Sequence, residues 1–173
     1  TLGTLPAHFH SLFYILSPGS AAPAAYRATY VQGLANLLDR VGRPDLRVFF
    51  VSSSSVYGEH HGQWGNEDTP CQPLGDNGRI LLEAEDLVRK RQPRTTILRL
   101  SGLYGNGLPR LFERLRSGSV SAPRQPVHWA NRIHRDDAAA ALVHLWQLQQ
   151  PEPLYLGSDD TPLPLHDLYQ YLA

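Results

Sequence analysis

Three segments rich in serine and glycine come at the ends of apolar runs, and they are the first candidates for chemistry. These segments are Ser17-Pro18-Gly19, Ser52-Ser53-Ser54-Ser55 and Ser101-Gly102. A serine hydroxyl both donates and accepts hydrogen bonds, so it can hold a polar ligand or the oxygen of a reacting group. If the three runs are neighbouring parallel strands, the segments meet at the carboxyl edge of one sheet, where α/β proteins bind their ligands.

Two other kinds of site have weaker support. A serine hydrolase needs a base and an oxyanion site beside its nucleophile, and no Gly-x-Ser-x-Gly segment is present to place Ser53 with His60 or His61 and Asp68. A zinc site needs spaced Cys or His ligands. Because the two histidines are adjacent and Cys71 is the only cysteine, we expect no metal.

Composition indicates a soluble globular domain. A chain of 173 residues, 42% of them hydrophobic, can bury one core. The 16 Lys and Arg residues balance 16 Asp and Glu residues and are scattered, which argues against nucleic-acid binding. No apolar run approaches the roughly 20 residues that span a bilayer, and the N-terminus lacks signal-peptide features. With a single cysteine, we expect a cytoplasmic protein without nucleic-acid or membrane partners, and a homodimer is compatible with this composition.

The order of apolar patterns predicts an α/β fold. Strands are expected at Ser11–Leu16, Arg47–Ser52, Thr95–Leu100 and Leu154–Leu156. Helices are expected at about Pro23–Val41, at Arg79–Arg91, around the stripe Leu108, Leu111, Phe112 and Leu115, after Asp136 or Asp137, and at Leu165–Leu172. Strands that alternate with helices imply a mostly parallel sheet covered on both faces.

Three local details complete this prediction. Residues 102–107 should form a loop. Asp136 or Asp137 should cap the helix that follows. The inner face of that helix should consist of Ala139, Leu142, Val143 and Trp146.

Four segments, in the same order, resemble the extended short-chain dehydrogenase/reductases, also called the NAD-dependent epimerase/dehydratase family. They are Val51–Gly58 (VSSSSVYG), Leu98–Gly105 (LRLSGLYG), Ile133–Ala138 (IHRDDA) and Leu154–Gly157 (LYLG). The resemblance implies a Rossmann-type doubly wound parallel sheet that this sequence enters at the family's fourth strand. Residues 1–173 would form a single domain, in which residues 102–173 contribute a small substrate-side region. The family's Gly-x-Gly-x-x-Gly turn, which cradles the cofactor pyrophosphate, has no counterpart here.

The same resemblance implies an atypical active site. Family members carry Tyr-x-x-x-Lys in segments resembling Tyr-Gly-x-Ser-Lys-Leu-x-Ala-Glu. Aligning Leu82-Glu83-Ala84-Glu85 with the end of this segment puts Asn77 where the catalytic Tyr would stand and Leu81 where the Lys would stand. In the family, the Tyr exchanges a proton with the substrate hydroxyl, and the Lys lowers the pKa of that Tyr. Ser53 precedes Val56 by three residues and matches the Ser/Thr that hydrogen-bonds the reacting hydroxyl, so it is the candidate catalytic residue.

The resemblance further implies NAD or NADP as cofactor and a small polar or sugar-like substrate. The cofactor would contact Ser17, Pro18, Gly19, Leu100, Ser101 and Gly102. The substrate would contact Tyr104, Asn131 and Arg132. Nucleotide-sugar members carry an Arg for the diphosphate where this sequence has Ala130, so a nucleoside-diphosphate sugar is not favoured.

Two functions follow from these residues. The segment Ser52–Gly58, which we call the serine loop and which carries Ser53, is preserved. It favours an enzyme of the epimerase/dehydratase kind with a rebuilt active site. Asn77 and Leu81 favour the alternative, a catalytically silent NAD(P)-binding sensor or interaction module.

Overall fold

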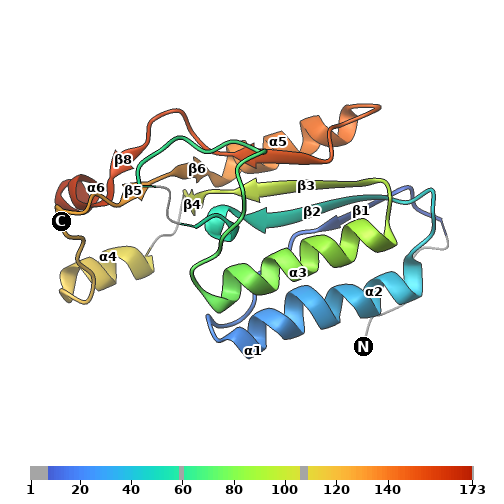
Figure 1. Cartoon of the computed structure of the whole chain (residues 1–173), viewed down its shortest axis with the longest axis horizontal. Helices are drawn as coiled ribbons and strands as arrows, with labels where there is room; N and C mark the ends of the chain where they lie inside the picture. Colours follow the sequence, from blue (N-terminus) through green and yellow to red (C-terminus); the bar gives the residue numbers. More distant parts are fainter. Residues whose placement is uncertain (1–7, 59–60, 106–108, 173) are drawn as a thin grey trace.

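A four-stranded parallel sheet forms the centre of the protein. A computed structural model describes residues 8–58, 61–105 and 109–172 (Figure 1). The sheet has the order β1-β2-β3-β7. Its strands are β1 (Ser11–Tyr14), β2 (Arg47–Ser53), β3 (Thr95–Leu100) and β7 (Leu154–Gly157). The predicted α/β class and parallel sheet are therefore confirmed.

Helices cover both faces of this sheet, as predicted (Figure 1). One face is covered by α3 (Asp76–Arg91) and by a continuous helix made of α1 (Pro23–Tyr26), a π-helical segment (Arg27–Gly33) and α2 (Leu34–Val41). The other face is covered by α5 (Arg135–Gln147). Each face has its own apolar core, because side chains of parallel strands point alternately to the two sides.

The remaining elements gather near the carboxyl ends of the strands (Figure 1). Two short strands, β4 (Gly102–Tyr104) and β6 (Arg132–His134), pair in parallel, while β5 (Trp129–Ala130) and β8 (Leu163–Pro164) pair in antiparallel fashion. The helices there are α4 (Pro109–Arg116) and α6 (Leu165–Leu172). A turn of 3-10 helix at Ser54–Val56 follows β2.

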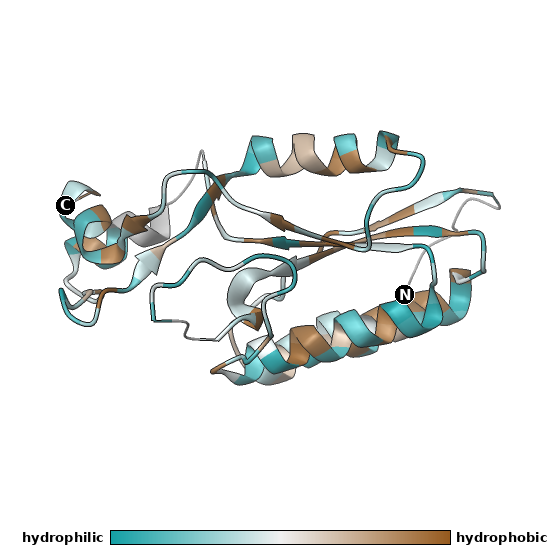
Figure 2. Ribbon diagram, turned by 45° about the horizontal axis from the view of Figure 1, so that its top comes forward, coloured by the Kyte–Doolittle hydropathy of each residue, from teal (hydrophilic) through white to brown (hydrophobic). Residues whose placement is uncertain are grey.

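One edge of the main sheet is open. Among the described residues, no strand pairs with the outer edge of β1. Phe13 of this strand stacks on Phe49 of β2, with ring centroids 4.9 Å apart, and stays partly exposed. In the colouring by hydropathy, brown apolar positions lie along the strands and along the helices that cover them (Figure 2).

Several predicted boundaries were wrong. The first strand ends at Tyr14, and Ile15 and Leu16 are more than half exposed. Residues 102–104 of the predicted loop form β4, since their backbone finds a partner in β6 about thirty residues later, which leaves no local signal in the sequence. Gly107 and Leu108 lie outside the described residues.

The predicted inner face of α5 was right at Leu142 and wrong at Ala139, Val143 and Trp146. Ala138, Leu142 and Leu145 are buried, whereas Val143 and Trp146 are about half exposed. An alanine-rich helix offers two apolar stripes about 100° apart, and the packing against the sheet selects the other one.

The predicted cap of α5 was wrong as well. The cap is His134, whose Nδ1 accepts a hydrogen bond from the Asp136 backbone N–H at 3.3 Å. Asp136 and Asp137 occupy the first turn instead, where a negative charge is favourable.

None of the described helices is long and apolar enough to span a lipid bilayer.

Candidate functional site

The carboxyl ends of β2 and β3 lie together at one edge of the sheet, as the sequence predicted, and the end of β7 lies beside that of β3. Ser53 is the register partner of Leu100, and Leu100 is the register partner of Gly157. The Ser101 backbone N–H donates to the Gly157 carbonyl at 2.9 Å, and the Gly102 N–H donates to the Asn131 carbonyl at 3.1 Å. This edge therefore brings the serine loop together with the predicted residues of the β3 end and with Asn131.

Ser53 ends β2 and caps the short helix that follows. Its Oγ accepts a hydrogen bond from the Ser55 backbone N–H at 3.1 Å, and its side chain is half-buried. The Oγ atoms of Ser52 and Ser101 are buried and have no hydrogen-bond partner among the described residues. An unpaired buried hydroxyl costs free energy unless a ligand or water satisfies it, so this edge has spare hydrogen-bonding capacity.

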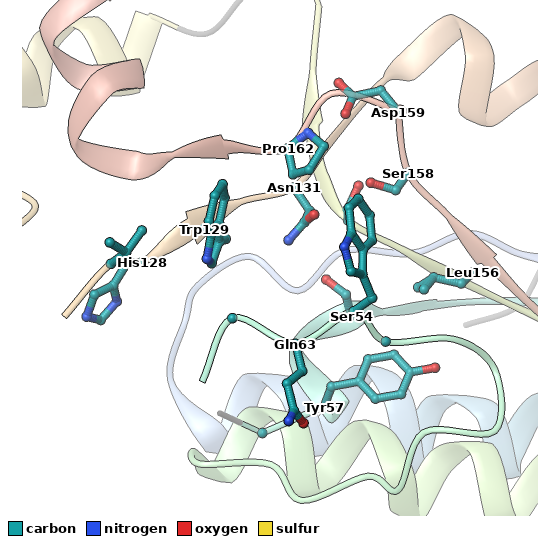
Figure 3. Close-up of a pocket in the computed structure, with 16 residues that line it drawn as sticks. Ser54, Tyr57, Gln63, His128, Trp129, Asn131, Leu156, Ser158, Asp159 and Pro162 are labelled. Atoms are coloured by element: carbon teal, nitrogen blue, oxygen red, sulfur yellow. The ribbon is translucent and has the colours of Figure 1, made fainter. Parts of the chain in front are cut away.

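A pocket of about 630 Å³ opens at this edge (Figure 3). Cavities of this size hold small-molecule ligands. Its lining comes from the serine loop, including Ser54 and Tyr57, from the loop that follows, including Gln63 and Trp64, and from residues 127–131 and 156–162. Of the residues predicted to bind a ligand, Ser101 and Asn131 line the pocket.

The other predicted site residues are not among the described residues that line the pocket. Ser53 comes directly before the lining residue Ser54, and Leu100 and Gly102 flank Ser101 at the end of β3. Ser17 and Gly19 are exposed after β1, and a side chain at Gly19 would meet open space. The Tyr104 ring packs edge-on against His134, with centroids 5.2 Å apart. The Arg132 side chain lies against Gly102. Tyr104 and Arg132 are not among the described residues that line the pocket, and their roles stay predictions.

The residues that stand in for the family's Tyr and Lys have different environments. Asn77 Nδ2 donates to the Ala21 carbonyl at 2.9 Å, which ties the start of α3 to the segment after β1. Asn77 Oδ1 is buried with no partner among the residues described. Leu81 is buried in the core between α3 and the sheet. It is therefore a packing residue in this structure.

A buried ion pair between Arg99 and Glu85 contacts the serine loop through Tyr57. The Arg99 guanidinium donates through Nε to Glu85 Oε1 at 3.0 Å and through Nη2 to Glu85 Oε2 at 2.7 Å. Its Nη1 donates to the Tyr57 hydroxyl at 2.9 Å. Burial lowers the pKa of Arg99, but the hydrogen bonds and charge of Glu85 outweigh it, so the net pKa is raised and the guanidinium stays charged. Burial raises the pKa of Tyr57, so its hydroxyl stays protonated at neutral pH.

The loop at residues 61–72, which we call the crossing loop, runs from the serine loop toward β7. The Tyr57 hydroxyl donates to the Asn66 carbonyl at 3.1 Å. Glu67 Oε1 accepts a hydrogen bond from the Leu156 backbone N–H at 2.8 Å. Because Leu156 lies in an edge strand, this carboxylate occupies a backbone group that would otherwise be unpaired. The two bonds hold the part of the chain that carries Trp64.

We expect Glu67→Ala to loosen the crossing loop. Hydrogen bonds to charged groups contribute roughly 1.5–3 kcal/mol, so protection of the Leu156 amide against hydrogen exchange should fall by about tenfold or more. Asp68→Ala is the matched control, since no side-chain bond of Asp68 holds this strand. Equal protection in wild type and Glu67→Ala would contradict the role of Glu67 as an anchor.

None of the predicted site residues lies in the crossing loop, although its sequence contains a usable signal. Trp64 stands in a segment rich in glycine and polar residues, with no apolar periodicity that would place it in a core. A large aromatic residue in such a context indicates a ligand or partner surface.

Comparison with known proteins identifies relatives of this chain. A family model described as the NAD dependent epimerase/dehydratase family matches residues 18–157. Among curated proteins, Protein YeeZ of Escherichia coli (strain K12) is 34% identical over 129 residues, which cover 73% of this chain and 45% of YeeZ.

Solved structures agree with this finding. A structure from Methylobacillus flagellatus described as an NAD-dependent epimerase/dehydratase is 41% identical, with a TM-score of 0.71, and the match covers 87% of this chain and 55% of that one. MoeE5, solved in complex with UDP-glucose and NAD, is 21% identical with a TM-score of 0.75, over 95% of this chain and 61% of that chain, and shows likeness of fold. The chain thus spans about half the length of these relatives.

Proposed function

Because the chain belongs to the NAD-dependent epimerase/dehydratase family, we propose that it forms the catalytic and substrate-side part of a protein that uses NAD or NADP to convert a small polar or sugar-like substrate. The observation that carries this proposal is the meeting of the serine loop with the ends of β3 and β7 at a ligand-sized pocket. In open α/β sheets, ligands bind beyond the carboxyl ends of the strands.

The residues present fit the nicotinamide end of a dinucleotide. Ser101 Oγ and Asn77 Oδ1 are buried polar atoms that lack partners in the described part of the chain, and an amide-bearing ligand could pair with such atoms. Ser17, Pro18, Gly19, Leu100 and Gly102 would contribute mainly backbone groups beside it. Bound NAD(P) would supply hydride transfer. The complexes of related folds with NAD, such as MoeE5, support this choice.

Ser53 would act on the substrate rather than on the cofactor. Its hydroxyl can hold the reacting oxygen, as the Ser/Thr of the family does. Asn77 cannot exchange a proton and Leu81 cannot supply charge, so the proton of the reacting hydroxyl would pass to another group or to water. Asn131 would hold the substrate in the pocket, with Tyr104 and Arg132 contributing from β4 and β6.

The alternative is a catalytically silent member that binds NAD(P) as a sensor or interaction module. Leu81 favours this reading, because a buried core leucine at the lysine position leaves no cation there. The intact serine loop favours catalysis. In either case we propose a cytoplasmic protein, and a homodimer is part of the same proposal.

Cofactor binding is the direct test. We expect NAD or NADP to raise the melting temperature of the full-length protein that contains this chain, and calorimetric titration should give a saturable isotherm. If neither dinucleotide binds, both readings are wrong. If one binds, turnover of a panel of carbonyl and sugar substrates separates the enzyme from the silent sensor.

A further inference from the structure

The pocket at the carboxyl edge has two exposed indole rings in its lining. Trp64 is 86% exposed and Trp129 is 48% exposed. Trp129 comes from β5, next to His128 (Figure 3), and Trp64 comes from the crossing loop, so two separate parts of the chain each contribute one ring. Large aromatic rings left open to water mark ligand surfaces, and their faces pack well against the apolar face of another ring.

The polar groups of the pocket are mostly uncharged. Ser101 is 5% exposed and its Oγ has no partner among the residues described. Asn131 and Ser158 add an amide and a second hydroxyl (Figure 3). Such groups both donate and accept hydrogen bonds, as the hydroxyl groups of a sugar or other polyol do.

The lining provides no fixed positive charge. None of the sixteen described residues that line the pocket is Lys or Arg, and Asp159 adds a carboxylate. Arg99 is committed to Glu85. Proteins hold phosphates with Arg or Lys side chains or with free helix N-termini. The first turns of α3 and α5 instead carry acids, namely Asp76 in α3 and Asp136 and Asp137 in α5.

On the premise of the proposed function, we propose that this pocket takes an uncharged, hydroxylated ring, such as a free sugar or a neutral glycoside, and not a nucleoside-diphosphate sugar. The apolar face of the ring packs on Trp64 and Trp129. Its hydroxyl groups pair with Asn131 and Ser158. A diphosphate would lose its hydration here and meet Asp159 without a compensating cation.

Calorimetric titration of the full-length protein with three probes tests this inference. The probes are phenyl β-D-glucopyranoside, UDP-glucose and inorganic pyrophosphate. We expect the neutral glycoside to bind with an affinity that does not change between low and high salt. Trp129→Ala and Trp64→Ala should each weaken it by about tenfold, as expected for the loss of one stacking ring. UDP-glucose should bind no more tightly, and pyrophosphate should not compete.

Tyr171→Ala is the matched control, since Tyr171 is an 88% exposed aromatic residue outside the pocket. Three results would overturn the inference: no binding of the glycoside, unchanged binding in both tryptophan variants, or tighter binding of UDP-glucose with competition by pyrophosphate. An NAD titration of the same preparation keeps the two proposals distinct. Glycoside binding without NAD binding would remove the proposed function alone, and NAD binding with UDP-glucose preference would remove this inference alone.

Discussion

Glu85→Ala is expected to lower the free energy of unfolding by about 3–5 kcal/mol, because it leaves the buried Arg99 guanidinium without its counter-ion. Both partners are buried, and the carboxylate accepts two hydrogen bonds from the guanidinium. The charge that remains is buried, and the uncharged side chains of Tyr57 and Cys71 beside it cannot neutralise it. Urea denaturation followed by circular dichroism measures the change.

Glu83→Ala provides a control on the same helix. Glu83 pairs with Arg27 at 2.8 Å, but both side chains are about half exposed. Exposed pairs contribute roughly 0–1 kcal/mol, so this variant should stay close to wild type. A second variant, in which Glu85 and Arg99 both become leucine, should be more stable than Glu85→Ala, since no unpaired charge is left. Equal losses for Glu83→Ala and Glu85→Ala would contradict this account.

If the full-length protein is the proposed enzyme, Ser53→Ala is expected to lower its turnover number by about 10²-fold, the usual loss when one hydrogen-bond donor to a reacting oxygen is removed. Steady-state kinetics with the substrate found in the panel measures it. The fall should lie in kcat rather than KM, since the hydroxyl would act on the reacting group while the residues that line the neighbouring pocket would bind the substrate.

The structural role of Ser53 must be separated from this effect. Its Oγ also accepts the Ser55 N–H, and the loss of such a cap costs about 1 kcal/mol. Ser53→Thr keeps the hydroxyl and should recover most of the turnover. Ser55→Ala removes a neighbouring exposed hydroxyl and should leave turnover unchanged. Wild-type turnover in Ser53→Ala would remove Ser53 from its proposed role.

The main elements could be predicted because their signals are local. The β3 strand and the α6 helix have the bounds that were expected, since the first is a short run rich in β-branched and aliphatic residues and the second has an amphipathic period. The α5 helix was placed correctly but its buried face was not. Ala138 and Ala139 are equally apolar in sequence, and the packing decides between them.

The pocket could be predicted only in part, because its walls come from distant segments. Ser101 and Asn131 were expected there, since each lies next to a family motif. Trp64 lines the same pocket from the crossing loop, which Glu67 attaches to β7, and a bond between residues 89 positions apart has no sequence pattern. Leu81 was recognised as a lost lysine, whereas its place in the core required the structure.

The open edge of β1 affects how this chain behaves on its own. Backbone N–H and C=O groups along an unpaired edge can bind the strand of another molecule, and Phe13 adds an apolar surface beside them. The edge is short, and none of its four residues, Ser11, Leu12, Phe13 and Tyr14, carries a charge that would repel a second strand. Recombinant production of these 173 residues alone therefore carries a risk of edge-to-edge aggregation, and a lysine introduced at the exposed Phe13 would be the simplest way to improve recovery.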